Sequence, residues 1–449
     1  MNAVTSPAAG SRAYAWLAAI MAATFVVHLV FSLYYVTHNN GGLRTTMTLQ
    51  LRDAAFLRVF PGWDTDGEGD AAFYNRLALG VIETGIPRNH SGAVSLYAPV
   101  YSYFMAACYI IAGVRQLSVS VPQALLAALI TGCLGLTARR LAPQAGGKVM
   151  LLTAALVLVN LRLAMYASSI SPTLLLLLWF ALALYLATFP LTSGKALGLA
   201  GAVSLGIFTQ AGFFVVGAAV ALWLMGQAMC QRRLAPAVGS SLILLCIGGR
   251  LMVTATAARV EPQRRENSLT VLWEANNPYY ESMTPTSLWE RRPGNPWTHW
   301  RPSEQEQQRY DHYIARADGD PGRAGFLWVS ENPMQYAKLC WVRLYTTLGP
   351  FTGMMSPRNR AISTFYWLLI FPAGYYGWWR TRHLEISRLA LLVFLALTTF
   401  ATLVITEWYL RYRFPVDLIM TIYAGVTYAG FMAHTTNPQA AGMPLPARS

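Results

Sequence analysis

Residues 170–189 read Ile170-Ser-Pro-Thr-Leu-Leu-Leu-Leu-Leu-Trp-Phe-Ala-Leu-Ala-Leu-Tyr-Leu-Ala-Thr-Phe189. The stretch holds no charged side chain, and about 20 apolar residues are what a helix needs to cross the hydrocarbon core of a membrane. Similar stretches recur along the whole chain. The sequence therefore predicts an all-α polytopic membrane protein.

The composition leads to the same class. The 449 residues are 55% hydrophobic and 12% charged, whereas an ordinary soluble domain is about 25% charged. The 14 Trp, 23 Tyr and 19 Phe are typical of helices that cross lipid–water interfaces. This balance excludes a disordered chain, a fibrous repeat and a disulfide scaffold, and it argues against a soluble enzyme.

The formal net charge of +14 carries information about topology. Seventeen of the 20 acidic residues lie in segments 37–118 and 255–360, which are nearly neutral because they also hold 19 of the 34 Lys and Arg. Most of the excess positive charge lies in short connectors, which is typical of the cytoplasmic side of a membrane. The charge therefore orients the chain in a membrane, and we expect no nucleic-acid partner.

About ten transmembrane helices are expected, with both termini in the cytoplasm. They are residues 13–36, 119–138, 147–165, 170–189, 195–209, 211–229, 236–254, 361–379, 387–406 and 412–433. The first follows Arg12 as a signal peptide would, but its length and the lack of a cleavage site predict a retained helix. Residues 97–114 are also apolar, yet counting them as a span would place the basic connectors outside. We therefore assign them to a helix in the outer membrane interface.

This topology predicts a single transmembrane domain over residues 1–433 and a disordered cytoplasmic tail over 434–449. Two large extracytoplasmic loops carry interfacial helices. The first loop, 37–118, contains amphipathic stretches at about 47–60 and at 71–84. The second loop, 255–360, is polar and Pro-rich up to about Gly325 and amphipathic from Pro333 to Leu348.

The sharpest local feature is Trp63-Asp-Thr-Asp-Gly-Glu-Gly-Asp70, in which four carboxylates fall within seven residues: Asp64, Asp66, Glu68 and Asp70. Crowded carboxylates repel one another, so one of them can serve as a proton acceptor. Asp64 and Asp66 could also hold a hard divalent cation through their oxygens. The alternative is a solvated acidic turn in which Asp70 caps the helix at 71–84.

Four arginines are candidates for binding an anionic group near the outer leaflet. Arg162, close to Asn160, and Arg250 lie in the outer halves of predicted spans, where a guanidinium needs water or a partner. Arg411 and Arg413 alternate with aromatic residues at the last outer hairpin, just before Asp417. Their forked donors match phosphate oxygens. The alternatives are snorkelling to the headgroups for the first two and an aromatic belt with local salt bridges for the second two.

Other catalytic signatures are missing from the sequence. No Walker loop, GxGxxG motif or nucleophile elbow occurs, and none of the seven His residues pairs at i, i+4. An ATP-driven pump and a serine hydrolase are therefore poorly supported.

The order of these parts resembles the GT-C superfamily of membrane glycosyltransferases, above all the branch with protein O-mannosyltransferases and the aminoarabinose transferase of lipid A. The likeness covers nearly the whole chain. The landmarks that carry it here are Asp70, Tyr74, Gly85, Tyr97-Ala-Pro-Val-Tyr101, Arg139-Arg140, Asn276-Asn277-Pro278, Glu331-Asn332-Pro333, Arg343 and Arg411 to Pro415. Ala71 follows Asp70 where several members have Glu, and Gln210 stands where several have Lys.

The resemblance implies an activity and a site. A sugar on a polyprenyl phosphate in the inner (plasma) membrane would pass to an acceptor at the periplasmic or extracellular face, with inversion. Asp70 would be the general base, and Arg411, Arg413, Arg250 and Arg162 would bind the lipid phosphate. Tyr74, Asp64, Asp66 and Glu68 would contact the acceptor or a metal. A divalent cation on Asp64 and Asp66 would be the one cofactor.

Two other functions fit the same pattern. A flippase or transporter of polyprenyl-phosphate sugars would use the same outer cavity and the same arginines, but it predicts repeated halves and broken helices near the midplane. A catalytically inactive assembly subunit would keep the scaffold without the chemistry. The donor sugar and the acceptor, whether glycan, lipid or protein, stay open.

Overall fold

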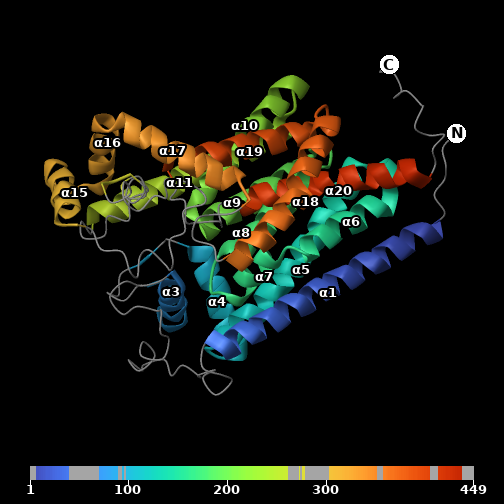
Figure 1. The fold of residues 1–449 in the computed structure, drawn as a ribbon, viewed down its shortest axis with the longest axis horizontal. Helices are drawn as coiled ribbons and strands as arrows, with labels where there is room; N and C mark the ends of the chain where they lie inside the picture. Colours follow the sequence, from blue (N-terminus) through green and yellow to red (C-terminus); the bar gives the residue numbers. More distant parts are fainter. Residues whose placement is uncertain are drawn as a thin grey trace. The chain divides into compact units, whose positions relative to one another are not determined.

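A computed structural model describes residues 7–39, 70–88, 94–95, 98–260, 273, 276–278, 303–350, 357–404 and 413–436. Within these ranges the regular structure is helical (Figure 1). Arg88 and Val94 form an isolated β-bridge. The chain divides into two compact units. The first comprises residues 1–211, 369–388 and 417–449, and the second comprises residues 212–368 and 389–416.

Every predicted span coincides with a helix or a helix pair. In the described part of the chain six helices are long and apolar enough to cross a membrane, and the bent pair α6 and α7 makes a seventh. The six are α1 (Pro7–Asn39), α5 (Gln116–Leu141), α10 (Phe214–Gln231), α11 (Leu234–Val260), α19 (Glu385–Val404) and α20 (Phe414–Thr436). The chain is therefore a multi-pass membrane protein.

Three further helices occupy the remaining predicted spans. Two are apolar but shorter, α8 (Thr173–Ala187) with 15 residues and α9 (Ser193–Thr209) with 17. The third, α18 (Pro357–Thr381), has 25 residues but is less apolar than the six. The segment assigned to the membrane interface forms α4 (Pro99–Ala112), a 14-residue helix. The number of crossings and their orientation stay predictions.

The first unit is built around α5. Helix α1 lies along α5 and along α6 (Gly146–Leu158), as Figure 1 shows. Glycines allow this close approach. A Cβ at Gly132 would lie 2.7 Å from the sulfur of Met21, and a Cβ at Gly147 would lie 2.5 Å from the Cβ of Ala13. Helix α1 also leaves apolar side chains such as Trp16 and Val30 exposed, as expected of a helix that faces lipid on one side.

A break separates α6 from α7 (Leu161–Ser168). The two helices are bent by 54° at Val159 and Asn160. Asn160 stands at the N-cap of α7, yet its side chain makes no capping bond. It is buried, and neither amide atom has a hydrogen-bond partner among the described residues. The break places Arg162 at the start of α7.

Helices α18 and α20 touch closely within the first unit. A Cβ at Gly374 would lie 2.7 Å from the carbonyl oxygen of Met420, and a Cβ at Gly377 would meet the carbonyl of Tyr423. The hydroxyl of Thr427 donates to the carbonyl of Ala373 at 2.6 Å. Small residues at such a crossing let the two backbones approach, as is usual for membrane helices.

The second unit contains α10, α11 and a helical insertion. Helices α10 and α11 pack along each other, and the hydroxyl of Ser240 donates to the carbonyl of Ala221 at 2.9 Å. The insertion consists of α15 (Glu304–Arg316), α16 (Pro321–Glu331) and α17 (Pro333–Leu348). Its core is a cluster of buried side chains that includes Trp273 and Trp328.

The two predicted amphipathic stretches that are described are confirmed, since 71–84 falls in α3 (Asp70–Thr84) and Pro333 to Leu348 forms α17. Helices α15 and α16 were not predicted from the sequence. The signals were present: Ser303 and Glu306 form a capping box, and Asp320 caps α16 with Pro321 at its first position. The stretch at 47–60 and most of the tail lie outside the described residues.

Candidate functional site

The predicted general base stands at a helix terminus. Helix α3 begins at Asp70, so the acidic motif runs directly into it. Only the backbone of Asp70 belongs to the described part of the chain, and Asp64, Asp66 and Glu68 lie outside it. The first turn of a helix stabilises negative charge, because its backbone N–H groups and the helix dipole point toward that end. The acidic motif therefore ends at the positive end of α3.

Helix α3 is fixed against α4 by two polar aromatic residues. Tyr74 is fully buried and lies edge-on to Tyr101, with ring centroids 5.2 Å apart and an interplanar angle of 87°. Two turns further along α4, the hydroxyl of Tyr109 donates to the side-chain oxygen of Asn75 at 2.7 Å. Tyr74 thus positions the helix that begins at Asp70.

Helix α4 is in turn tied to α5 and to the end of α7 through Gln123. The hydroxyl of Tyr101 donates to Oε1 of Gln123 at 2.9 Å. The amide nitrogen of Gln123 donates to the carbonyl oxygens of Ala167, at 3.0 Å, and Ser169, at 2.7 Å. Gln123 is fully buried, so these bonds replace water for groups that would otherwise be unsatisfied. The chain of contacts connects the start of α3 to the centre of the first unit.

The turn that ends α3 explains the glycine among the family landmarks. Gly85 has φ +78°, a left-handed conformation that favours glycine. Its amide donates to the carbonyl of Val81 at 2.8 Å, and its own carbonyl accepts a bond from the hydroxyl of Tyr103 at 2.9 Å. Gly85 therefore closes α3 and returns the chain toward α4.

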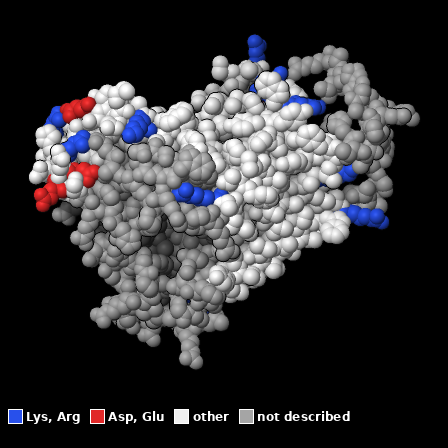
Figure 2. Space-filling view, in the orientation of Figure 1, with Lys and Arg blue, Asp and Glu red and all other residues white. Residues whose placement is uncertain are grey.

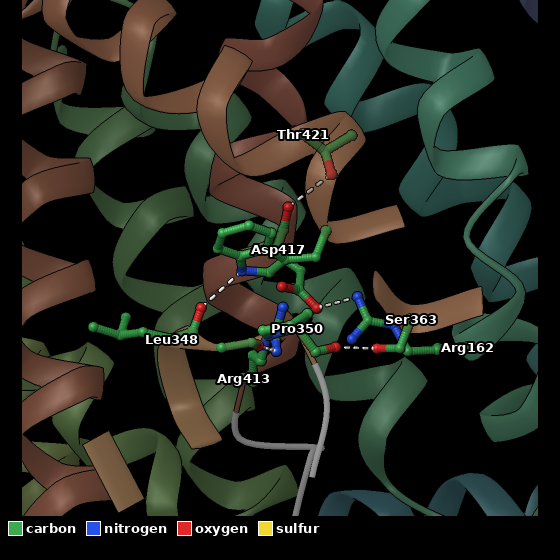
Figure 3. A network of polar contacts seen from close by, with 9 residues as sticks. Arg162, Leu348, Pro350, Ser363, Arg413, Asp417 and Thr421 are labelled. Atoms are coloured by element: carbon green, nitrogen blue, oxygen red, sulfur yellow. Dashed lines mark hydrogen bonds and ion pairs between the residues drawn. The ribbon is translucent and has the colours of Figure 1, made fainter. Parts of the chain in front are cut away.

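Arg162 and Asp417 form a buried ion pair in the first unit. Nη2 of Arg162 lies 2.8 Å from Oδ2 of Asp417, and the two residues are 7% and 1% exposed (Figure 3). Arg162 comes from the start of α7, and Asp417 lies in the first turn of α20. The carboxylate neutralises the guanidinium, so a lipid phosphate would have to compete with Asp417 for Arg162.

Arg413 caps the end of α17 in the second unit. It is 2% exposed, and its Nη1 donates to the carbonyl of Gly349, directly after α17. The neighbouring carbonyls of Leu348 and Pro350 accept from the side chains of Trp367 and Ser363 (Figure 3). Three donors thus hold the chain where it leaves α17, and a cation there also complements the negative end of the helix.

The Asn276-Asn277 element joins α17 within the second unit. Nη1 of Arg343 donates to the side-chain oxygen of Asn276 at 2.9 Å, and both residues are buried. The amide nitrogen of Asn277 donates to the carbonyl of Trp273 at 2.8 Å. Trp273 packs against Tyr310, with ring centroids 4.8 Å apart. These landmarks hold the helical insertion together.

The predicted site residues are distributed over both units. Asp70, Tyr74 and Arg162 belong to the first, while Arg250, Arg411 and Arg413 belong to the second. Arg250 is 8% exposed on α11, and Arg411 lies outside the described residues. The structure adds Asn75 and Gln123, which were not predicted from the sequence, and links each to a tyrosine of α4. One of these tyrosines, Tyr101, ends the landmark that begins at Tyr97, whereas nothing local marked Asn75 or Gln123.

A metal site is not found in the part of the chain that the structure describes. Within it, no three His, Cys, Asp or Glu side chains lie close enough to hold a metal ion. The two predicted ligands, Asp64 and Asp66, lie outside these residues. A divalent cation at the acidic motif stays a prediction.

No family model matches the chain, and no curated protein is similar to it in sequence. In structure it is similar to ArnT from Cupriavidus metallidurans in the apo state, with a TM-score of 0.50 and 14% identity over 83% of this chain and 57% of ArnT. Two further structures match less well. ArnT bound to undecaprenyl phosphate has a TM-score of 0.47 at 14% identity, over 95% of this chain and 64% of ArnT. The archaeal oligosaccharyltransferase AglB from Archaeoglobus fulgidus, in complex with an inhibitory peptide and a dolichol-phosphate, has a TM-score of 0.48 at 13% identity. That match covers 95% of this chain and 52% of AglB.

The chain therefore spans a little over half the length of the ArnT structure that it matches best among these. The likeness confirms the GT-C-like fold that the sequence led us to expect. At 14% identity it concerns the fold and not the activity.

Proposed function

We propose that the protein is an integral-membrane glycosyltransferase that moves a sugar from a polyprenyl-phosphate donor to an acceptor at the extracytoplasmic face of the inner (plasma) membrane. The observation that carries the proposal is the fold it shares with ArnT, combined with an acidic motif that leads into α3. In this proposal residues 1–433 act as one catalytic domain, and the tail 434–449 lies in the cytoplasm.

Asp70 acts as the general base of an inverting displacement. The acceptor hydroxyl gives its proton to the Asp70 carboxylate, and the acceptor oxygen forms a bond to the anomeric carbon. The bond between that carbon and the phosphate oxygen breaks, and its electron pair leaves with the lipid phosphate. The position of Asp70, at the end of the acidic motif and the start of α3, is the observation that supports this role.

The leaving phosphate needs positive charge nearby, because negative charge builds up on it in the transition state. Arg413, Arg411 and Arg250 serve this purpose in the proposal. The bond from Arg413 to the carbonyl of Gly349 fixes the guanidinium in place without cancelling its charge. Arg162 contributes less, because Asp417 already neutralises it.

The remaining residues of the motif assist the acceptor. Asp64, Asp66 and Glu68 contact the acceptor in this proposal, and their oxygens are of the type that a divalent cation would bind. Tyr74 has a supporting role instead, since it is fully buried against Tyr101. No step of the proposed reaction passes through a metal.

The experiment that tests the function offers the purified wild-type protein a panel of polyprenyl-phosphate sugars in lipid nanodiscs, with glycan, lipid and peptide acceptors. Mass spectrometry then follows the release of polyprenyl phosphate and the formation of product. We expect release from at least one donor, with product when the acceptor is present. Donor binding without release from any donor would reject the transferase and favour the flippase or the inactive subunit.

A further inference from the structure

Three cations lie over two aromatic rings at one end of the first unit, and a fourth follows close by. The guanidinium of Arg140 lies 3.6 Å from the ring centroid of Phe189, and the ammonium of Lys195 lies 4.5 Å from the same centroid. The guanidinium of Arg139 lies 4.6 Å from the centroid of Tyr14. The backbone of Lys148 lies nearby, since a Cβ at the neighbouring Gly147 would meet that of Ala13, next to Tyr14.

Acidic residues that could neutralise this cluster are missing from the surrounding sequence. From Thr84 to Val260 the chain contains no Asp or Glu. Arg162, in the same stretch, is paired with Asp417 from α20. Among the described residues, by contrast, no ion pair joins any of the four cations to a carboxylate. Two cations held on a single ring repel each other, so the arrangement favours a bound anion.

Helix ends add to the positive potential at this place. Lys148 and Lys195 lie in the first turns of α6 and α9, neither of which has an acidic residue in that turn or a side-chain cap. A lysine near a helix N-terminus is unfavourable, because that end of the dipole is already positive. Nη1 of Arg139 is buried, and no hydrogen-bond partner for it lies within the described ranges. Each of these features would be relieved by an anion.

Apolar side chains exposed on the same helices indicate what kind of anion fits. Trp16, on α1 with Tyr14, is 63% exposed, and Leu197, on α9 with Lys195, is 48% exposed. A phospholipid offers a phosphate for the cations and acyl chains for these side chains. On the face shown in Figure 2, the described acidic side chains gather beside basic ones over α15 and α16 of the second unit, and the other Lys and Arg have no acidic neighbour among the described residues.

From these observations we infer that Arg139, Arg140, Lys148 and Lys195, together with Tyr14 and Phe189, form a binding site for the headgroup phosphate of an anionic phospholipid. The site lies at the end of the first unit that the sequence predicts to face the cytoplasm, so it is independent of the proposed sugar transfer. The ring of Phe189 contacts both Arg140 and Lys195, so it keeps the two charges close enough to bind one phosphate together.

The test measures the lipids that the purified full-length protein retains from nanodiscs containing equal amounts of phosphatidylglycerol and phosphatidylcholine. Native mass spectrometry counts both lipids. We expect wild type to retain phosphatidylglycerol preferentially. A basic residue near an anionic lipid contributes about 1 kcal/mol, so Arg140→Gln should reduce this preference about fivefold, and adding Lys195→Gln should reduce it by roughly 25-fold in all.

Two variants distinguish binding at this specific site from general attraction between a basic surface and an anionic lipid. Arg388→Gln removes the same charge from an exposed arginine whose Nη1 lies 2.8 Å from Oε1 of Glu385, and we expect it to leave the preference unchanged. Phe189→Leu keeps every charge but removes the ring. It should lower the preference roughly two- to fivefold, the size of a cation–π contribution.

Three results would overturn the inference. They are no preference in wild type, an equal loss in Arg388→Gln and Arg140→Gln, or an unchanged preference in Phe189→Leu. Thermal unfolding in phosphatidylcholine alone checks that each variant is folded.

Discussion

At the scale of the residue, the pair of Arg162 and Asp417 shows how an arginine is accommodated inside this protein. Its side chains are 8% and 1% exposed, so each depends on the other for compensation of its charge. Removing one partner of such a pair leaves an uncompensated buried charge, whereas removing both does not. The pair therefore holds α7 against α20 within the first unit.

We predict that Arg162→Leu and Asp417→Leu will each destabilise the protein by about 3–5 kcal/mol. The double variant should be more stable than either single one, because no charge stays buried alone. Thermal unfolding in detergent, followed by tryptophan fluorescence, measures all four proteins. A double variant that loses the sum of the two single effects would contradict this account.

Sequence could identify Arg162 as unusual but could not identify its partner. An arginine within an apolar stretch is a local signal, and Asp417 was visible just inside the last helix. The two are 255 residues apart, so only the fold could pair them. Our assignment of Arg162 to the lipid phosphate rested on the residue type, its place in the outer half of a span and the family resemblance, and the ion pair makes it the weakest of the four arginines.

At the scale of the element, the hydrogen bonds of Gln123 join α5 to the end of α7 and to α4, the helix against which α3 packs. Gln123→Leu keeps the approximate size of the side chain but removes the acceptor for Tyr101 and the donor to the end of α7. We predict a loss of about 1–3 kcal/mol for each group left unsatisfied, with slower sugar transfer. Gln116→Leu, which removes one bond to the carbonyl of Ser168, should cost less in unfolding temperature and in rate. Equal effects of the two variants would show that Gln123 has no special role.

The crossing of α18 and α20 depends on glycine. A Cβ at Gly377 would meet the backbone carbonyl of Tyr423, which cannot rotate away. Gly377→Ala should therefore destabilise by about 1–3 kcal/mol, as overpacking does. Gly201→Ala on α9 is the matched control, since nothing lies within 4 Å of its Cβ position, and it should be neutral or stabilising by up to about 1 kcal/mol. Urea or thermal unfolding measures the stability of both variants. A Gly377→Ala variant as stable as wild type would refute the close crossing of α18 and α20.

Helix boundaries were predictable to the extent that they depend on local chemistry. Pro333 at the start of α17 and Gly349 after its end bracket the predicted stretch. Helices α15 and α16 were missed because their polar surface hides the apolar positions, including Tyr313 and Trp328, that pack around Trp273. A capping box at Ser303 was the better guide there.

At the scale of the whole molecule, the composition was enough to predict a multi-pass membrane protein, because apolar helices depend on local sequence. The arrangement of the acidic motif and the arginines was not predictable, since it depends on contacts between residues far apart in the chain. The orientation follows from loop charge and is open to a direct test.

We predict that Gln305, at the start of α15, faces outward and that Gly194, at the start of α9, faces the cytoplasm. Cysteines introduced as Gln305→Cys and Gly194→Cys, in a variant with its five native cysteines replaced, can be labelled in intact cells with a membrane-impermeant maleimide. Position 305 should react directly, and position 194 only after permeabilisation. The reverse pattern would invert the topology and place the acidic motif in the cytoplasm.

The most direct test of the central claim compares single-turnover sugar transfer by wild type and Asp70→Asn. Asparagine keeps the size of the side chain and caps a helix as well as aspartate does, but it cannot accept the proton. The account predicts a rate lower by about 10²–10⁴-fold, with unchanged binding of polyprenyl phosphate and unchanged unfolding temperature. Equal rates for the two proteins would contradict the assignment of Asp70 as the general base.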